Sequence, residues 1–141
     1  MTVSTAESCT GGYIAHRITG IPGSSRYFWG SVVSYDNSVK MNSLDVKEET
    51  LKTYGAVSEQ TVKEMVSGAI SSLKTDIAIA TSGIMGPGGG TEEKPVGTIW
   101  VAVGNKDKII THKLALTKSR SKNIEYTGNF ALNFLRKFLT R

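Results

Sequence analysis

Apolar residues recur along the chain with the periods of helices and strands, and the clearest pattern lies in the middle. After Ser58, a good N-cap, one helical face collects the apolar residues Val62, Met65, Val66, Ala69, Ile70 and Leu73. The short apolar run over residues 76–81 is typical of a strand that is buried on both faces. A last helix is expected from about Ser121, and its buried side should hold Ile124, Ala131, Leu132, Leu135 and Leu139.

The N-terminal segment predicts a strand, a tight turn and a helix. Residues 2–5 are β-prone, and Ile14 and Ile18 lie one helical turn apart in a segment that Gly20 ends. Residues 28–36 then favour a second strand, because they contain a run of β-branched and aromatic side chains.

Two short helices should follow that second strand. The first carries Lys40 and can be capped by Asn37 or Ser38. The second is expected over residues 46–54, and Gly55 closes it.

The C-terminal half adds a hairpin to this alternation of strands and helices. A loop rich in Gly and Pro covers residues 82–97, and strands over 98–103 and 108–116 should pair around a turn at 104–107. The pattern predicts a single domain over residues 1–141, a three-layer α/β/α sandwich with a mixed, mostly parallel sheet of about five strands.

Composition agrees with a soluble domain of common size. The chain has 141 residues, of which 39% are hydrophobic and 21% charged. No apolar run reaches the length needed to span a membrane, and the N-terminus lacks the features of a signal peptide, so we expect no membrane association and a cytoplasmic location. Cys9 is the single cysteine, which excludes an internal disulfide framework and a cysteine-rich zinc site.

The charge balance suits an anionic partner. Lys and Arg number 17 against 12 Asp and Glu, for a net charge of +5, which fits a phosphorylated small molecule or a nucleic acid. The basic residues are spread out, and the densest stretch holds only Lys118, Arg120 and Lys122. No signature that combines aromatic and basic residues is present, which argues against nucleic acid as the partner.

The segment over residues 7–12, Glu-Ser-Cys-Thr-Gly-Gly, is the first candidate for chemistry. Ser8 should lie in a turn between strand and helix, where backbone N–H groups can stabilise an oxyanion and glycine lets a substrate approach the backbone. An ordinary Ser/Thr cap before a helix would give the same pattern, so the residues alone leave both interpretations open.

A nucleophile also needs a base, and the chain offers few histidines. Cys9 is an alternative nucleophile, but a catalytic cysteine usually works with a histidine, and His16 and His112 have no evident orienting carboxylate. Lysine can act as the base when its pKa is lowered from about 10.4. Lys40 is suggestive because Tyr35 should end a strand close to it, although a solvated lysine remains the default interpretation.

A second candidate element is the glycine-rich segment over residues 82–91. Its flexible backbone, with Gly83, Gly86, Gly88 and Gly89, can surround a phosphate or a sugar. The segment matches neither a P-loop nor a dinucleotide-binding turn, so ATP and NAD have little support as ligands.

Five segments together resemble the C-terminal domain of the CinA family, whose stand-alone members are nicotinamide mononucleotide deamidases. In the family's order they are TAESCTGG at 5–12, IPGSS at 21–25, VVSYDNSVK at 32–40, YGAVSEQ at 54–60 and SGIMGPGGGTEEKPVGTIW at 82–100. The resemblance implies the α/β/α sandwich and a serine–lysine hydrolase with Ser8 as nucleophile, Lys40 as base and Tyr35 beside them. The backbone of Cys9, Thr10 and Gly11 would stabilise the oxyanion.

The implied reaction is hydrolysis of the carboxamide of nicotinamide mononucleotide to nicotinate mononucleotide and ammonia, without a metal or another cofactor. The alternative is a non-catalytic nucleotide-binding module of the same family. Arg120, just ahead of the last helix, is the candidate for the substrate phosphate. Members of the family usually begin with a helix ahead of the first strand, and this chain begins within that strand, so we expect an uncovered face and a homo-oligomer, a dimer or larger.

Overall fold

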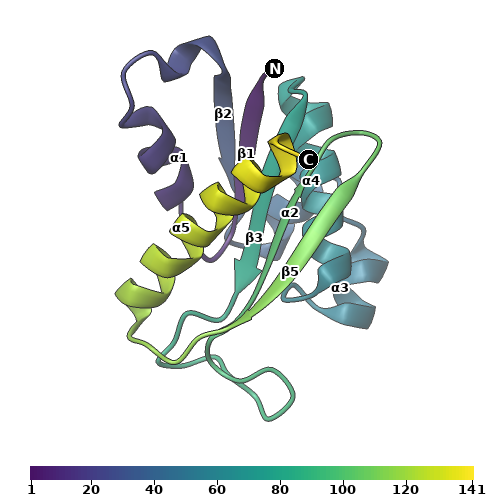
Figure 1. Cartoon of the computed structure of the whole chain (residues 1–141). Helices are drawn as coiled ribbons and strands as arrows, with labels where there is room; N and C mark the ends of the chain where they lie inside the picture. The colour runs from purple at the N-terminus through teal and green to yellow at the C-terminus, as the bar shows by residue number, and fades with distance from the viewer.

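A computed structural model describes all 141 residues of the chain. Five strands form one mixed sheet in the order β2-β1-β3-β4-β5, with helices packed on it (Figure 1). The strands are β1 (Val3–Glu7), β2 (Phe28–Val33), β3 (Ile77–Gly83), β4 (Thr98–Gly104) and β5 (Ile109–Ala115). The helices are α1 (Tyr13–Thr19), α2 (Asn37–Leu44), α3 (Glu48–Tyr54), α4 (Glu59–Leu73) and α5 (Arg120–Leu139), with a short 3₁₀ turn at Ser24–Arg26. The prediction of an α/β fold with five strands is confirmed.

The prediction of a mostly parallel sheet is wrong. β1 pairs in parallel with β2 and with β3, whereas β3 with β4 and β4 with β5 are antiparallel. A strand that runs parallel to the one before it needs a long crossover connection, which usually contains a helix. The segment between β3 and β4 contains no helix. The chain therefore turns back beside β3, and the sheet divides into a parallel half and an antiparallel half.

Helices cover both faces of the sheet, and β3 shows how each face is built. In Figure 1, α1 and α5 lie on one side of the strands, with α4 on the other. Ile77 and Ile79 point into the core under α1 and α5, and Ala78 and Ala80 point toward α4. The small side chains on the second face let α4 lie close to the sheet.

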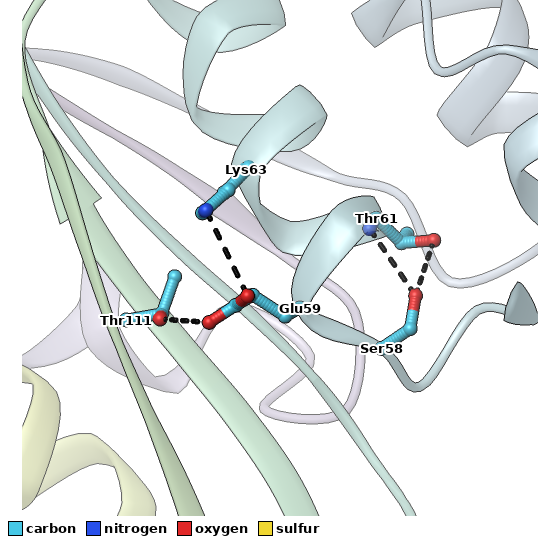
Figure 2. Close-up of polar contacts among 5 residues, drawn as sticks. All are labelled: Ser58, Glu59, Thr61, Lys63 and Thr111. Atoms are coloured by element: carbon cyan, nitrogen blue, oxygen red, sulfur yellow. Dashed lines mark hydrogen bonds and ion pairs between the residues drawn. The ribbon is translucent and has the colours of Figure 1, made fainter.

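The predicted cap of α4 is confirmed, and side chains fix this end of the helix against the sheet. Figure 2 shows the Ser58 hydroxyl accepting the N–H of Thr61 at 3.2 Å. The carboxylate of Glu59 accepts from the hydroxyl of Thr111 on β5 at 2.6 Å and forms an ion pair with Lys63 at 3.7 Å. The start of α4 is thereby tied to the antiparallel half of the sheet.

The boundaries near the predicted Lys40 helix differ from the sequence-based expectation. The second strand ends at Val33, so Tyr35 lies beyond it rather than at its end. The cap of α2 is Asp36, whose carboxylate accepts from the backbone N–H of Ser38 at 3.0 Å, and Asn37 is the first helical residue. An Asp side chain reaches the second N–H of a helix well, which explains why it takes the capping role.

Helix α5 is longer than the sheet that it covers, which corrects one predicted core position. Its 20 residues span about 30 Å, whereas a seven-residue strand spans about 23 Å. Ala131 is fully buried and Leu132 packs partly buried against the core, but Leu139, predicted to be buried, is 47% exposed in the last turn. No helix of the chain, α5 included, has the length and apolar character to cross a membrane.

Gly68 on α4 marks a close approach of α2, the helix that carries Lys40. A Cβ at Gly68 would lie 1.9 Å from the carbonyl oxygen of Leu44, which is backbone and cannot move independently. We expect Gly68→Ala to lower the free energy of unfolding by about 3 kcal/mol, measured by urea denaturation. Ser71→Ala, on the exposed side of the same helix, serves as the control and should change it by less than about 0.5 kcal/mol. Equal effects of both would contradict the close packing.

Candidate active site

Ser8 follows β1 directly, at the carboxyl ends of the parallel strands. Its N–H donates to the carbonyl of Thr81 on β3 at 3.0 Å, and the carbonyl of Glu7 accepts from Ser34 beyond β2 at 2.9 Å. The backbone at Glu7 and Ser8 is therefore held by the residue after β2 on one side and by β3 on the other. In open α/β sheets this edge is where ligands bind.

The amine of Lys40 lies beside the Ser8 hydroxyl and is almost completely enclosed. Only 1% of the residue is exposed, and Nζ lies 3.0 Å from Oγ of Ser8. The same Nζ donates to the backbone carbonyls of Ser34 at 2.7 Å and Tyr35 at 3.2 Å. A neutral amine has two N–H donors and one lone pair. In the neutral form, with both donors on the carbonyls, the lone pair is left for the serine hydroxyl, which is the arrangement of a base that accepts a proton.

Burial lowers the pKa of Lys40 below its ordinary value of 10.5, because the protein interior disfavours the ammonium form. The nearby Cys9 and Asp36 act in the opposite direction and are smaller contributions. No carboxylate forms an ion pair with Lys40. The environment therefore favours the neutral amine at lower pH than in water.

Cys9 is a poor rival nucleophile in this structure. The residue is 5% exposed, and burial raises the pKa of its thiol to about 12. The reactive form of cysteine is the thiolate, which is scarce at neutral pH when the pKa is so high.

The turn after Ser8 leaves backbone N–H groups without a partner in the protein. The N–H of Ser8 is donated to Thr81, and that of Gly11 to the carbonyl of Ser8 at 3.1 Å. The N–H groups of Cys9 and Thr10 make no hydrogen bond within the chain. Among the backbone donors predicted for an oxyanion, these two are free to act.

A cavity of about 280 Å³ opens in front of Ser8 and Lys40. It brings together most of the residues that the sequence singled out: Ser8, Cys9, Tyr35, Lys40, Gly83, Gly88, Gly89 and Arg120. Thr10, Gly11 and Gly86 do not line it. Its size approaches the lower end of the range for small-molecule sites.

Arg120 and Tyr35 form one wall of this cavity. Nη1 of Arg120 donates to the carbonyl of Gly86 at 2.7 Å, and Nη2 donates to the hydroxyl of Tyr35 at 2.9 Å. Two of the five guanidinium N–H groups are thus used within the protein. Tyr35 contacts Lys40 through its backbone carbonyl, whereas the residue as a whole is 61% exposed and its hydroxyl faces Arg120.

The glycine-rich segment runs along the cavity and is fastened to α5. Gly86 has a φ of 87°, in the left-handed region that favours glycine, and its carbonyl holds Arg120. The buried amide of Asn123 on α5 donates to the carbonyl of Met85 at 3.0 Å. These contacts place Gly88 and Gly89 beside the cavity.

Sequence reasoning missed Asn37, Ala56 and Val57 in the cavity wall, and it placed Ser82, Ile84 and Met85 in the candidate glycine-rich segment without assigning them a role. Ser82 belongs to the end of β3 rather than to the loop in which it was expected. Neither histidine lines the cavity, and His112 packs on Phe130 with the ring centres 4.8 Å apart. No group of three or more His, Cys, Asp and Glu side chains is placed to hold a metal ion.

Comparison with known proteins gives a consistent result. The family model of the CinA C-terminal domain matches residues 1–139. A CinA-like protein of Cytophaga hutchinsonii is 51% identical over 138 residues, 98% of this chain and 33% of that protein. A CinA-like protein of Chloroherpeton thalassium is 48% identical over 143 residues, 99% of this chain and 34% of that protein. The chain thus spans about one third of the length of these curated relatives.

Solved structures show the same fold. The competence/damage inducible protein CihA from Agrobacterium tumefaciens is 41% identical, with a TM-score of 0.95 over 97% of this chain and 84% of that chain. The competence damage-inducible protein A from Klebsiella pneumoniae is 34% identical, with a TM-score of 0.96 over 99% of this chain and 87% of that chain. With a family model, sequences and structures in agreement over almost its full length, the chain belongs to the CinA C-terminal domain family.

Proposed function

We propose that the protein hydrolyses the carboxamide of nicotinamide mononucleotide to nicotinate mononucleotide and ammonia. The observation that carries this proposal is the enclosed contact between Nζ of Lys40 and Oγ of Ser8, at 3.0 Å and without a carboxylate paired to the amine. A buried lysine held by two carbonyls has no evident structural benefit, because burial makes its charge costly.

In the first half of the proposed reaction, Oγ of Ser8 attacks the carboxamide carbon while the lone pair of Lys40 takes the hydroxyl proton. The carbonyl oxygen gains negative charge, and the free N–H of Cys9, which lines the cavity, donates to it. The C–N bond then breaks, and the lysine ammonium returns its proton to the departing nitrogen. The products of this half are ammonia and an ester of nicotinate on Ser8.

In the second half, water attacks the ester carbon and Lys40 takes one of its protons. The ester C–O bond breaks, the proton passes to Oγ of Ser8, and nicotinate mononucleotide leaves. Lys40 is neutral again at the end, so one amine serves both halves. This is why a lysine with a lowered pKa suits the role.

The phosphate of the substrate is assigned in this proposal to Arg120, which lines the same cavity as Ser8. Its position as the first residue of α5 adds the positive end of the helix dipole. The glycine-rich segment beside it lets a ligand approach the backbone closely.

Arg120→Ala should raise KM for nicotinamide mononucleotide by about 10- to 100-fold, because a charge-assisted hydrogen bond is lost. KM for the dephosphorylated riboside should change far less. Tyr35→Phe, which removes the neutral partner of Arg120 but keeps the cation, is the control and should affect both substrates alike. Steady-state kinetics with both substrates measure this. An equal rise in KM for both substrates in Arg120→Ala would remove Arg120 from the phosphate site.

The proposed reaction is tested by incubating the purified protein with nicotinamide mononucleotide and measuring ammonia and nicotinate mononucleotide. We expect equal amounts of both products and none from Ser8→Ala. Binding of the mononucleotide without release of ammonia would instead favour a nucleotide-binding module.

A further inference from the structure

Glu7 is a fully buried carboxylate that has no basic side chain as a partner. It is the last residue of β1, its exposed fraction is 0%, and the ion pairs of the protein lie elsewhere. A buried charge is costly unless hydrogen bonds compensate it. Its partners therefore indicate what the carboxylate is for.

Both carboxylate oxygens accept from the first turn of α1. Oε1 accepts the N–H of Ile14 at 2.8 Å, and Oε2 accepts the N–H of Ala15 at 2.9 Å. N–H groups at a helix start have no partner within the helix, and the helix dipole favours an anion there. Glu7 thus satisfies the N–H groups at the start of α1, and it joins the helix to β1 across the Ser8 turn.

Threonine hydroxyls attach the same carboxylate to the turn and to the strand. Oγ1 of Thr10, inside the turn, donates to Oε1 of Glu7 at 2.7 Å and lies 2.8 Å from the hydroxyl of Thr81 on β3. On the strand side, Oγ1 of Thr5 lies 3.1 Å from Oε2 of Glu7 and 2.6 Å from the hydroxyl of Ser31 on β2. Oε2 is also 3.5 Å from that Ser31 hydroxyl. Only the first of these threonines lies in the Ser8 turn.

We propose that Glu7 is a positioning residue: through Thr10 and the first turn of α1 it holds Ser8 at hydrogen-bonding distance from Lys40 and fixes the backbone of the turn beside the cavity. The catalytic consequence rests on the proposed function, but the geometric one does not. Glu7 touches neither the cavity nor Lys40, so it acts only through the turn.

The two threonines provide a matched pair of variants. Each is buried, and each hydroxyl contacts Glu7 and one further hydroxyl. Thr10→Val should lower kcat by about 10- to 100-fold with KM nearly unchanged, because a displacement of about 1 Å costs that much. Thr5→Val should leave kcat within about threefold, because its hydroxyl lies on the strand side. Glu7→Gln should lower kcat more than Thr10→Val, because its amide nitrogen would oppose a backbone N–H of α1.

Crystal structures of the two threonine variants give a readout that does not depend on activity. In Thr10→Val, Oγ of Ser8 should move by about 1 Å, well beyond the limit of about 3.2 Å for a good hydrogen bond to Nζ of Lys40. In Thr5→Val it should stay at 3.0 Å. If the parent protein releases no ammonia, the proposed function fails, and these distances still decide the role of Glu7. Equal losses of kcat in both threonine variants, or an unmoved Ser8 in Thr10→Val, would overturn the inference.

Discussion

Lys40→Met is expected to lower kcat by about 10³-fold, because it removes the only group placed to accept the Ser8 proton. Methionine has a similar length and no charge, so it fills the same space without leaving a cavity. The variant loses the two hydrogen bonds to the carbonyls of Ser34 and Tyr35, but it also removes a buried polar group. Single-turnover measurements of ammonia release will report the chemical step.

Ser8→Ala should lose as much activity as Lys40→Met, and the double variant should be scarcely worse than either, because groups that act as one unit are not additive. Lys63→Met is a suitable control, because Lys63 is an exposed lysine on α4 whose partner is Glu59. It should retain kcat within about tenfold, as expected for a surface residue. A folded Lys40→Met protein with nearly the parent kcat would refute the pairing of Ser8 with Lys40, even if Ser8 proved essential.

The rate should also depend steeply on pH. Only the neutral amine of Lys40 can accept a proton, and below its pKa the neutral fraction falls tenfold for each pH unit. We therefore expect kcat/KM to rise tenfold per pH unit in acid solution and to level off below pH 10.5, because burial lowers the pKa of this lysine. Across three pH units below the midpoint the change is about 10³-fold.

Asp36→Asn tests the assignment of this pH profile to Lys40. The Asp36 carboxylate raises the pKa of Lys40, so its removal should shift the midpoint toward lower pH. Asparagine is as good a helix cap as aspartate, so α2 should keep its start. The remaining activity of Lys40→Met should lack the tenfold slope. A midpoint that stays in place in Asp36→Asn, with the same slope in Lys40→Met, would assign the titration to another group.

Local patterns predicted the elements that carry strong periodicity. The apolar stripe and the Ser58 cap gave α4, and the short apolar run gave β3. The direction of β4 beside β3 could not be read in this way, because it depends on pairing across the loop that joins them. Periodicity reports which side chains are buried but not which strands become neighbours.

The candidate site was predictable in part. Ser8 was recognisable from its turn, but the residues alone could not choose Lys40 among 17 basic residues, and the family resemblance made that choice. The role of Glu7 was not predicted, because nothing in the sequence distinguishes a carboxylate beside a glycine turn from an ordinary solvent-exposed one. Its burial becomes evident only when α1 folds back and presents its first N–H groups to the carboxylate.

The inner position of β1 has a consequence for how the protein matures on the ribosome. β1 precedes every other strand in the sequence, yet its partner β3 follows about half a chain later, and Ser8 donates to Thr81 there. Until that part of the nascent chain has emerged, β1 can pair only with β2, and the Ser8 turn lacks its hydrogen bond to Thr81. Arg120 arrives later still, with α5. A partly synthesised chain therefore carries an inert serine, and the proposed hydrolase becomes competent only after long-range strand pairing, which is a slow event in folding.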